Sequence, residues 1–305
     1  MNAEEILLLT PREIQGLLSI DECIVAVEHA FHLHGEGKTA PPGVLSMHSR
    51  DGGFHVKAGV LELSRPYFGA KVNGNFAENG KRFGLPTIQG VIVLCDAEKG
   101  SPLAVMDSRG ITSLRTGAAT AVAAKYLARR DSHTATICGC GNQGRIQVRA
   151  VSEELAIPVT SVTDLPVAVR RSDICVTCTP SRQPLLGSDD VTPGTFIAAV
   201  GADSPEKQEL HPSLMAKSKI ITDILQQSAV MGDLHHALEA GVLTQADVYA
   251  ELGDVVSGKK LGRESDDEII IFDSTGMALQ DVAAAALVYE KAERQGSGVR
   301  LSFAA

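Results

Sequence analysis

The spacing of hydrophobic and polar positions changes along the chain, and each pattern predicts a different kind of structure. The first forty residues have a helical pattern, in which Thr10 to Glu13 has the form of a capping box with proline at the first helical position. A second helix is expected from about Ser19 to His32. From Gly53 short β-rich runs follow, and they predict an antiparallel meander. Its strands are expected at 54–57, 68–72, 89–95 and 102–106.

A different pattern begins after Arg115. Residues 116–128 are rich in alanine and predict a long helix, and 134–138 read as a buried strand. Strand and helix then alternate as far as 269–272, as they do in a doubly wound parallel sheet. The last helix is expected to return to the first domain. The fold class is therefore α/β: a Rossmann-type domain at 116–277, and a substrate-binding and dimerisation domain with a mostly antiparallel sheet at 1–115 and 278–305.

A glycine-rich turn follows the strand at 134–138. Gly139-Cys140-Gly141-Asn142-Gln143-Gly144 has the form G-x-G-x-x-G, and a helix-compatible segment comes after it. Gly139 permits a tight turn, Gly141 lets the backbone approach a pyrophosphate, and Gly144 allows close packing of helix against strand. Because free N–H groups at a helix start favour an anion, the turn predicts a dinucleotide site for NAD(H) or NADP(H).

The segment after this turn is too short for a complete Rossmann unit. A second strand should end in Asp or Glu about 20 residues on, to bind the ribose. Two crossovers of at least about 10 to 12 residues each do not fit between Gly144 and the strand-like 157–162. Either one strand is absent or residues are missing between Val151 and Ser152; we favour the second and expect a break there. Asp164 is at the wrong distance to replace the acid, so NAD against NADP stays open.

The composition and charge of the chain exclude some classes of binding partner. The net charge of −9 and pI near 5.5 argue against nucleic acid or an anionic membrane, because no basic patch offsets them. The chain start lacks the form of a signal peptide, and no run approaches the ~18 to 20 apolar residues of a membrane span, so a cytoplasmic protein is expected. All six cysteines lie in apolar runs, and the pair Cys175 and Cys178 is expected to be buried rather than to bind a metal. No metal site is predicted.

Motifs spread along the chain resemble those of the ornithine cyclodeaminase and mu-crystallin family. They cover nearly the whole chain in order. The resemblance implies a nicotinamide-dependent enzyme of small amino or imino acids, and a homodimer built by the sheet of the first domain. The matching segments are 71–75, 84–90, 94–97, 111–119, 200–210 and 272–281.

The resemblance also implies roles for single residues. Lys71 and Arg115 match the pair that binds the substrate carboxylate, and Asp203 matches the proton-transferring acid beside the nicotinamide. The planar fork of arginine suits a carboxylate, and we expect Arg115 at the head of a helix, where the dipole disfavours a structural cation. If the resemblance is set aside, the sequence alone indicates only that Lys71 is an ordinary lysine on a strand and that Asp203 is a turn residue. Positions that contact the cofactor or line the site are matched by Thr87, Arg115, Asn142, Gln143, Thr179, Val200, Gly201, Lys207, Ser274 and Thr275.

Departures from the family pattern bear on the substrate. Gly43 stands where a cyclodeaminase has an arginine, and His55 and Lys57 occupy the segment where a Glu followed by Met-Pro is expected. His55 and Lys57 share one strand face, which either lines the site or faces water. We therefore predict reduction of a cyclic imine such as Δ1-pyrroline-2-carboxylate. The alternatives are an ornithine cyclodeaminase, a cis-3-hydroxy-L-proline dehydratase, an alanine dehydrogenase-like oxidoreductase, and a mu-crystallin-like binder of nicotinamide or a hormone.

Overall fold

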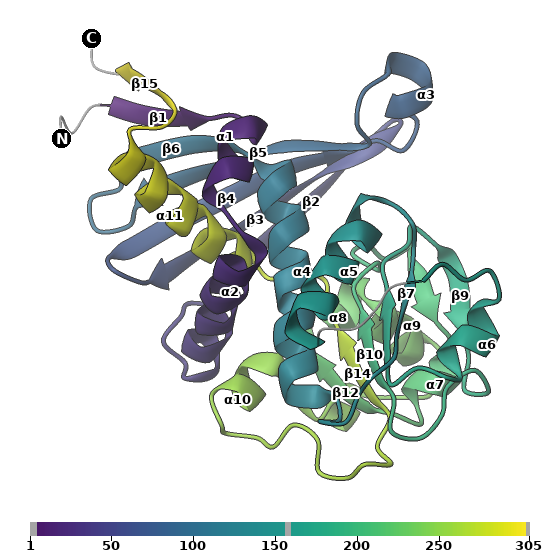
Figure 1. Ribbon diagram of the computed structural model, residues 1–305. Coiled ribbons are helices and arrows are strands. Elements are labelled where there is room, and N and C mark those ends of the chain that lie inside the picture. The colour runs from purple at the N-terminus through teal and green to yellow at the C-terminus, as the bar shows by residue number, and fades with distance from the viewer. Residues whose placement is uncertain (1–4, 156–159, 303–305) are drawn as a thin grey trace. The chain divides into compact units, whose positions relative to one another are not determined.

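The computed structural model describes residues 5–155 and 160–302, and these form two compact units (Figure 1). The first unit contains the residues up to 30, 37–115 and those from 277 on; the second contains 31–36 and 116–276. Residues 31–36, which we assigned to the first domain, group with the second unit. The predicted fold class, a parallel Rossmann-like sheet with a separate and mostly antiparallel sheet, is confirmed.

The first unit is built on a seven-stranded sheet of order β15-β1-β6-β5-β4-β3-β2. The predicted meander is confirmed, since each strand from β2 to β6 pairs antiparallel with the next. The helical prediction was wrong for the first described residues, which form β1 and pair parallel with β6. The strands are β1 (Glu5–Leu9), β2 (Gly43–Ser49), β3 (Gly52–Glu62), β4 (Pro66–Asn75), β5 (Ile88–Asp96), β6 (Pro102–Asp107) and β15 (Val299–Ser302).

One face of this sheet is covered by α11 (Ala278–Gln295), drawn in yellow in Figure 1. The approach is close: a Cβ on Gly59 or Gly69 would lie 2.9 Å from Leu279 Cδ2 or 2.8 Å from Val282 Cγ2. The predicted capping box is confirmed at the start of α1 (Pro11–Leu17), and the further helices are α2 (Ile20–Gly35) and α3 (Asn79–Phe83). On the opposite face, exposed apolar side chains lie in register on adjacent strands: Leu45, Met47, Phe54, Val72 and Val91.

The second unit contains a six-stranded parallel sheet of order β13-β12-β14-β10-β8-β7. Its core is aliphatic, with Ile197, Ile220 and Ile271 fully enclosed. The strands are β7 (Ala135–Cys138), β8 (Ile174–Thr177), β10 (Phe196–Ala199), β12 (Lys219–Thr222), β13 (Ala250–Glu251) and β14 (Ile270–Asp273), with β9 (Arg182–Leu186) and β11 (Gln208–Leu210) paired separately. The helices are α5 (Asn142–Leu155), α6 (Leu165–Val169), α7 (Pro212–Met215), α8 (Leu225–Met231), α9 (Asp233–Glu239), η1 (Gln245–Asp247) and α10 (Leu252–Val256).

The strand that leads into the glycine turn, β7, has one neighbour, β8, in the sheet that the described residues form. Helix α5 runs through Val151 and Ser152. That residues are missing between these two positions stays a prediction. Of the strand expected at 157–162, residues 157–159 lie outside the described part, and 160–162 form no strand. Asp164 caps α6, where its carboxylate accepts a hydrogen bond from Val167 N at 3.1 Å.

Helix α4 (Ser108–Leu127) begins earlier than predicted. Arg115 therefore lies in the helix interior and not at its head, so the argument from the helix dipole does not apply to it. Buried Ile111 anchors the early turns, which is why the helix extends into residues of modest propensity. No helix within residues 5–155 and 160–302 is long and apolar enough to cross a membrane.

Candidate functional site

In the second unit, the predicted residues follow the carboxyl ends of neighbouring parallel strands. Cys138, Thr177, Ala199 and Asp273 end β7, β8, β10 and β14, and they pair at one level of the sheet. Ligands of doubly wound sheets bind outside this edge. The residues that the fold places just beyond it are Gly139, Gly141, Asn142, Gln143 and Gly144 after β7, Thr179 after β8, Val200, Gly201, Asp203 and Lys207 after β10, and Ser274 and Thr275 after β14.

The glycine turn has the geometry that a dinucleotide requires. Gly139 adopts a φ of 129°, which is unfavourable for residues with a side chain. A Cβ on Gly144 would collide with the carbonyl oxygen of Gly139, so the helix can approach the strand only without a side chain there. A Cβ on Gly141 would meet nothing within 4 Å, which leaves the backbone beside the start of α5 open to a phosphate.

Two predicted site residues form an ion pair in the loop after β10. The ammonium of Lys207 donates to the Asp203 carboxylate at 2.5 Å. The Asp203 side chain is 45% exposed, so it is accessible from solvent. The carbonyl oxygen of Lys207 accepts from His236 Nε2 at 2.8 Å, which ties the loop to α9.

The residues after β14 are held by a buried carboxylate that the sequence analysis did not identify. Asp223 accepts from Ser274 Oγ at 3.1 Å, from Thr275 Oγ1 at 3.3 Å and from Gly276 N at 2.6 Å. Gln227 Nε2 also donates to Thr275 Oγ1. A second carboxylate that the sequence analysis missed, that of Glu209, accepts hydrogen bonds from Thr179 and Gly201. Asp223 directly follows β12 and Glu209 lies in β11, both far in sequence from the residues that they bind, so only the fold reveals these contacts.

In the first unit, Lys57, Lys71 and Arg115 gather around Asp281 of α11. Lys71 Nζ donates to Asp281 Oδ2 at 2.7 Å, and Arg115 Nε donates to Oδ1 at 3.1 Å. Lys57 and Lys71 face each other across β3 and β4, and all four side chains are buried. Burial raises the pKa of the Asp281 carboxyl, but the positive charges of Arg115, Lys71 and, to a smaller extent, Lys57 outweigh it, so the pKa is lowered. Two buried cations thus share one carboxylate, and a third basic residue, Lys57, lies opposite Lys71.

The electrostatics of this cluster favour a further anion. Burial is the main cause that lowers the pKa of Lys71 to about 7, while Asp281 opposes the shift and Arg115 and Lys57 add to it. Arg115 Nη1 donates to Gln280 Oε1 at 2.9 Å, and Gln280 Nε2 is buried without an acceptor among the described residues. A carboxylate bound here would stabilise the charged lysine and accept hydrogen bonds from buried donors.

Two further predicted residues of the first unit, His55 and Thr87, form contacts of their own. His55 shares a strand face with Lys57, as predicted, but it is half-buried and bonds Ser46 at 3.0 Å. Thr87 is exposed in the loop before β5, where its carbonyl oxygen accepts from Phe76 N. The fold therefore brings Lys57, Lys71 and Arg115 together, and the roles expected of His55 and Thr87 stay predictions.

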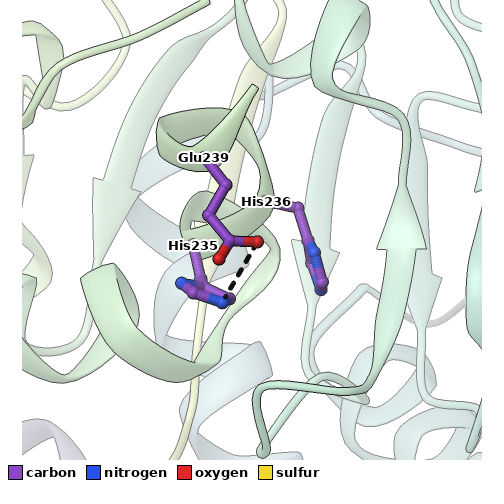
Figure 2. A group of neighbouring side chains, drawn as sticks. All are labelled: His235, His236 and Glu239. Carbon is purple, nitrogen blue, oxygen red and sulfur yellow. Dashed lines mark ion pairs between the residues drawn. The ribbon is translucent and has the colours of Figure 1, made fainter. Parts of the chain in front are cut away.

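Cysteine and histidine groups were also considered as metal or redox sites. Cys175 is fully buried, as predicted, whereas Cys178 is only partly buried. Burial raises the pKa of Cys178 to about 12, so neither is a ready thiolate. His235, His236 and Glu239 of α9 could hold an ion, since their ligand atoms lie within 4.8 Å of one another (Figure 2). However, His235 pairs with Glu239 at 3.5 Å, and His236 already bonds the Lys207 carbonyl. These contacts account for the group without a metal.

Comparisons with known proteins agree with this architecture. An alanine dehydrogenase from Archaeoglobus fulgidus is 40% identical over 322 residues, which cover 98% of this chain and 99% of that protein. The solved dimer of an archaeal alanine dehydrogenase with bound NAD has a TM-score of 0.93 at 40% identity, covering 98% of this chain and 100% of that one. Thermococcus litoralis Δ1-pyrroline-2-carboxylate reductase, solved with NADH and L-proline, has a TM-score of 0.89 at 32% identity, covering 96% and 99%.

The comparisons also bear on the short segment after the glycine turn. The alignment with alanine dehydrogenase extends over 322 residues and the chain has 305, so that relative contains residues that this chain lacks. The sequence model of the ornithine cyclodeaminase/mu-crystallin family matches two segments, residues 4–164 and 153–296, which overlap close to the end of α5. Together they span nearly the whole chain, and the chain belongs to the ornithine cyclodeaminase/mu-crystallin family.

Proposed function

We propose that this protein reduces a small cyclic imino acid, Δ1-pyrroline-2-carboxylate or a close analogue, to the L-amino acid, with NADH or NADPH as the reductant. The observation that carries the proposal is that two buried cations, Lys71 and Arg115, share the single carboxylate of Asp281. Burying a charge is costly unless a partner compensates it, and here Lys71 and Arg115 share the one carboxylate of Asp281. A substrate carboxylate supplies the second negative charge.

The proposed roles follow from the chemistry of each side chain. Arg115 and Lys71 bind the substrate carboxylate, and Asp281 holds both cations in place. Asp203 keeps the imine nitrogen protonated, which makes the adjacent carbon electrophilic, and Lys207 holds the Asp203 carboxylate in place between turnovers. The reduced nicotinamide supplies the hydride when bound, and the glycine turn and the loops after β8, β10 and β14 bind it.

The relatives support the type of reaction. They include an alanine dehydrogenase and a Δ1-pyrroline-2-carboxylate reductase, and those solved structures contain NAD or NADH. The prediction of a nicotinamide-dependent oxidoreductase is thereby confirmed. The cyclic substrate rests on Gly43, His55 and Lys57, which replace residues expected in a cyclodeaminase and leave no carboxylate there for the side-chain amine of ornithine.

A second candidate substrate is the open-chain imine that pyruvate forms with ammonia. It is favoured by the 40% identity to alanine dehydrogenase over almost the whole chain. The two are separated by following the absorbance of NADH with Δ1-pyrroline-2-carboxylate and, separately, with pyruvate and ammonium. Faster oxidation of NADH with the cyclic imine is expected. If NADH is oxidised only with pyruvate and ammonium, the substrate is the open-chain imine and the proposed cyclic substrate is wrong.

The homodimer is proposed on the exposed face of the first unit's sheet. Leu45, Met47, Phe54, Val72 and Val91 lie side by side on β2 to β5 and are each at least 37% exposed. Contiguous apolar patches of this kind mark protein interfaces. The archaeal relative is a dimer. Met47→Glu should shift the mass measured by light scattering toward the monomer, whereas Val25→Glu, at an exposed apolar position on α2, should not.

A further inference from the structure

We propose that Glu209 is a positioning residue that locks two loops of the cofactor site, those that contain Thr179 and Gly201, into one arrangement. The inference rests on the proposed function, because it assigns these loops to the nicotinamide cofactor. Glu209 would not touch the reacting atoms. It would act through the backbone and side-chain groups that it holds.

The contacts of Glu209 join two adjacent strand ends. Its Oε1 accepts from Thr179 N at 2.6 Å and from Thr179 Oγ1 at 2.7 Å, just beyond β8. Its Oε2 accepts from Gly201 N at 2.9 Å, just beyond β10. Each oxygen therefore holds a different loop, and the distance between the loops is set by the width of one carboxylate.

The carboxylate fits these loops so closely that one of them requires glycine. A Cβ on Gly201 would collide with the Glu209 carboxylate, so no larger residue is accommodated there in this arrangement. The backbone of Glu209 is fixed as well, since Glu209 N and Leu210 N both donate to Asp233 Oδ1 at 2.8 Å. Asp233 N and Leu234 N in turn donate to the Asp273 carboxylate at the end of β14.

The cost of burying Glu209 argues for a role beyond simple packing. Its side chain is fully buried, and it forms no ion pair with a Lys or Arg among the described residues. Burial raises the pKa of its carboxyl, although the hydrogen bonds from Thr179 and Gly201 lower it. A buried acid without a cation is expensive and is retained where its acceptor geometry is needed. Here three donors of two predicted cofactor loops converge on it.

Glu209→Gln tests the inference, because it keeps the shape and removes one acceptor. One end of the amide must then present N–H groups to the N–H of Gly201 or of Thr179. The dissociation constant of NADH, measured by its fluorescence on the folded protein, should rise about 10-fold to 100-fold, while kcat at saturating NADH should change far less. Amide hydrogen exchange without cofactor should accelerate at Thr179 and Gly201.

Two controls separate positioning from loss of stability. Glu239→Gln removes an exposed acid of the same unit, and Ile197→Val weakens the core of β10; both should keep the wild-type affinity for NADH. An unchanged NADH affinity in Glu209→Gln would overturn this inference alone. Equal loss of affinity in Ile197→Val would also overturn it, because the effect would then follow stability. Wild-type protein that binds neither NADH nor NADPH would overturn the proposed function together with this inference.

Discussion

Lys71 makes the binding of a substrate carboxylate depend on pH in a predictable way. Its side chain is 4% exposed, and burial is the main cause that lowers its pKa to about 7. A carboxylate binds the charged lysine, so above this pH binding requires uptake of a proton. Below it the lysine is already charged. Affinity should therefore be constant below about pH 7 and fall as the pH rises further.

The size of the effect follows from the pKa. Each pH unit above it leaves one tenth as much ammonium, so the dissociation constant should rise up to about 10-fold per unit and up to about 100-fold by pH 9. Furan-2-carboxylate is a suitable probe, because its ring resembles the substrate and does not titrate. Calorimetry in buffers of different ionisation enthalpy gives both the affinity and the proton taken up.

Stability should change in the opposite direction over the same window. The unfolded chain binds the proton of Lys71 up to its ordinary pKa of 10.5, whereas the folded chain releases it near 7. The unfolded state therefore binds more protons between these values, and this lysine makes the free energy of unfolding rise with pH there.

The control variants locate the effect at Lys71. Lys71→Met should bind furan-2-carboxylate weakly and without the step in pH, and it should lose the rise in stability. Lys81→Met, at an exposed lysine of the same unit, should behave as the wild type. A wild-type affinity that does not change from about pH 6 to about pH 9, or the same step in Lys71→Met, would refute the reasoning.

Three further predictions concern other parts of the site. Asp281→Asn leaves the buried cations Lys71 and Arg115 without their carboxylate, so it should lower the free energy of unfolding by about 3 to 5 kcal/mol. Added furan-2-carboxylate should restore part of this free energy, and chemical denaturation with and without it measures the loss and the recovery. Asp203→Asn should lower kcat by ~10²- to 10⁴-fold and leave the affinity for NADH nearly intact. If a melting curve shows that the variant is folded and its kcat per folded molecule equals that of the wild type, Asp203 is not the proton-transferring acid. NADH and NADPH should bind within about 10-fold of each other. The reason is that β7 is the edge strand of the sheet that the described residues form, so no strand lies outside it to supply an acid that binds the ribose. A preference above about 100-fold in a fluorescence titration would contradict this.

Local signals in the sequence predicted most of the fold. The capping box at Thr10 and the glycine turn from Gly139 depend on a few adjacent residues, and both formed as expected. β1 was missed because its four consecutive apolar residues, 6–9, show no helical or strand period, and because it pairs with β6, almost a hundred residues away in the sequence. The early start of α4 was missed because Gly110 and Thr112 are poor helix formers that burial of their neighbours overrides.

The site was predicted one member at a time, without its partners. Lys71 and Arg115 were identified through resemblance, but Asp281, 210 residues from Lys71, was not. A signal for it exists: Asp281 lies in an apolar, alanine-rich helix where an acid needs a buried partner. Glu209 and Asp223 have no such signal. Their role depends on which strand ends the fold places side by side, and that is a property of the sheet order.

The most direct test of the central claim is the consumption of reduced nicotinamide by the purified protein with Δ1-pyrroline-2-carboxylate, followed by absorbance, with the product identified by chiral chromatography. We predict stoichiometric oxidation of NADH or NADPH and formation of L-proline, with activity greatly reduced in Lys71→Met. Conversion of L-ornithine or cis-3-hydroxy-L-proline without net change in the nicotinamide, and no oxidation with any imine, would contradict the account and identify the protein as a lyase.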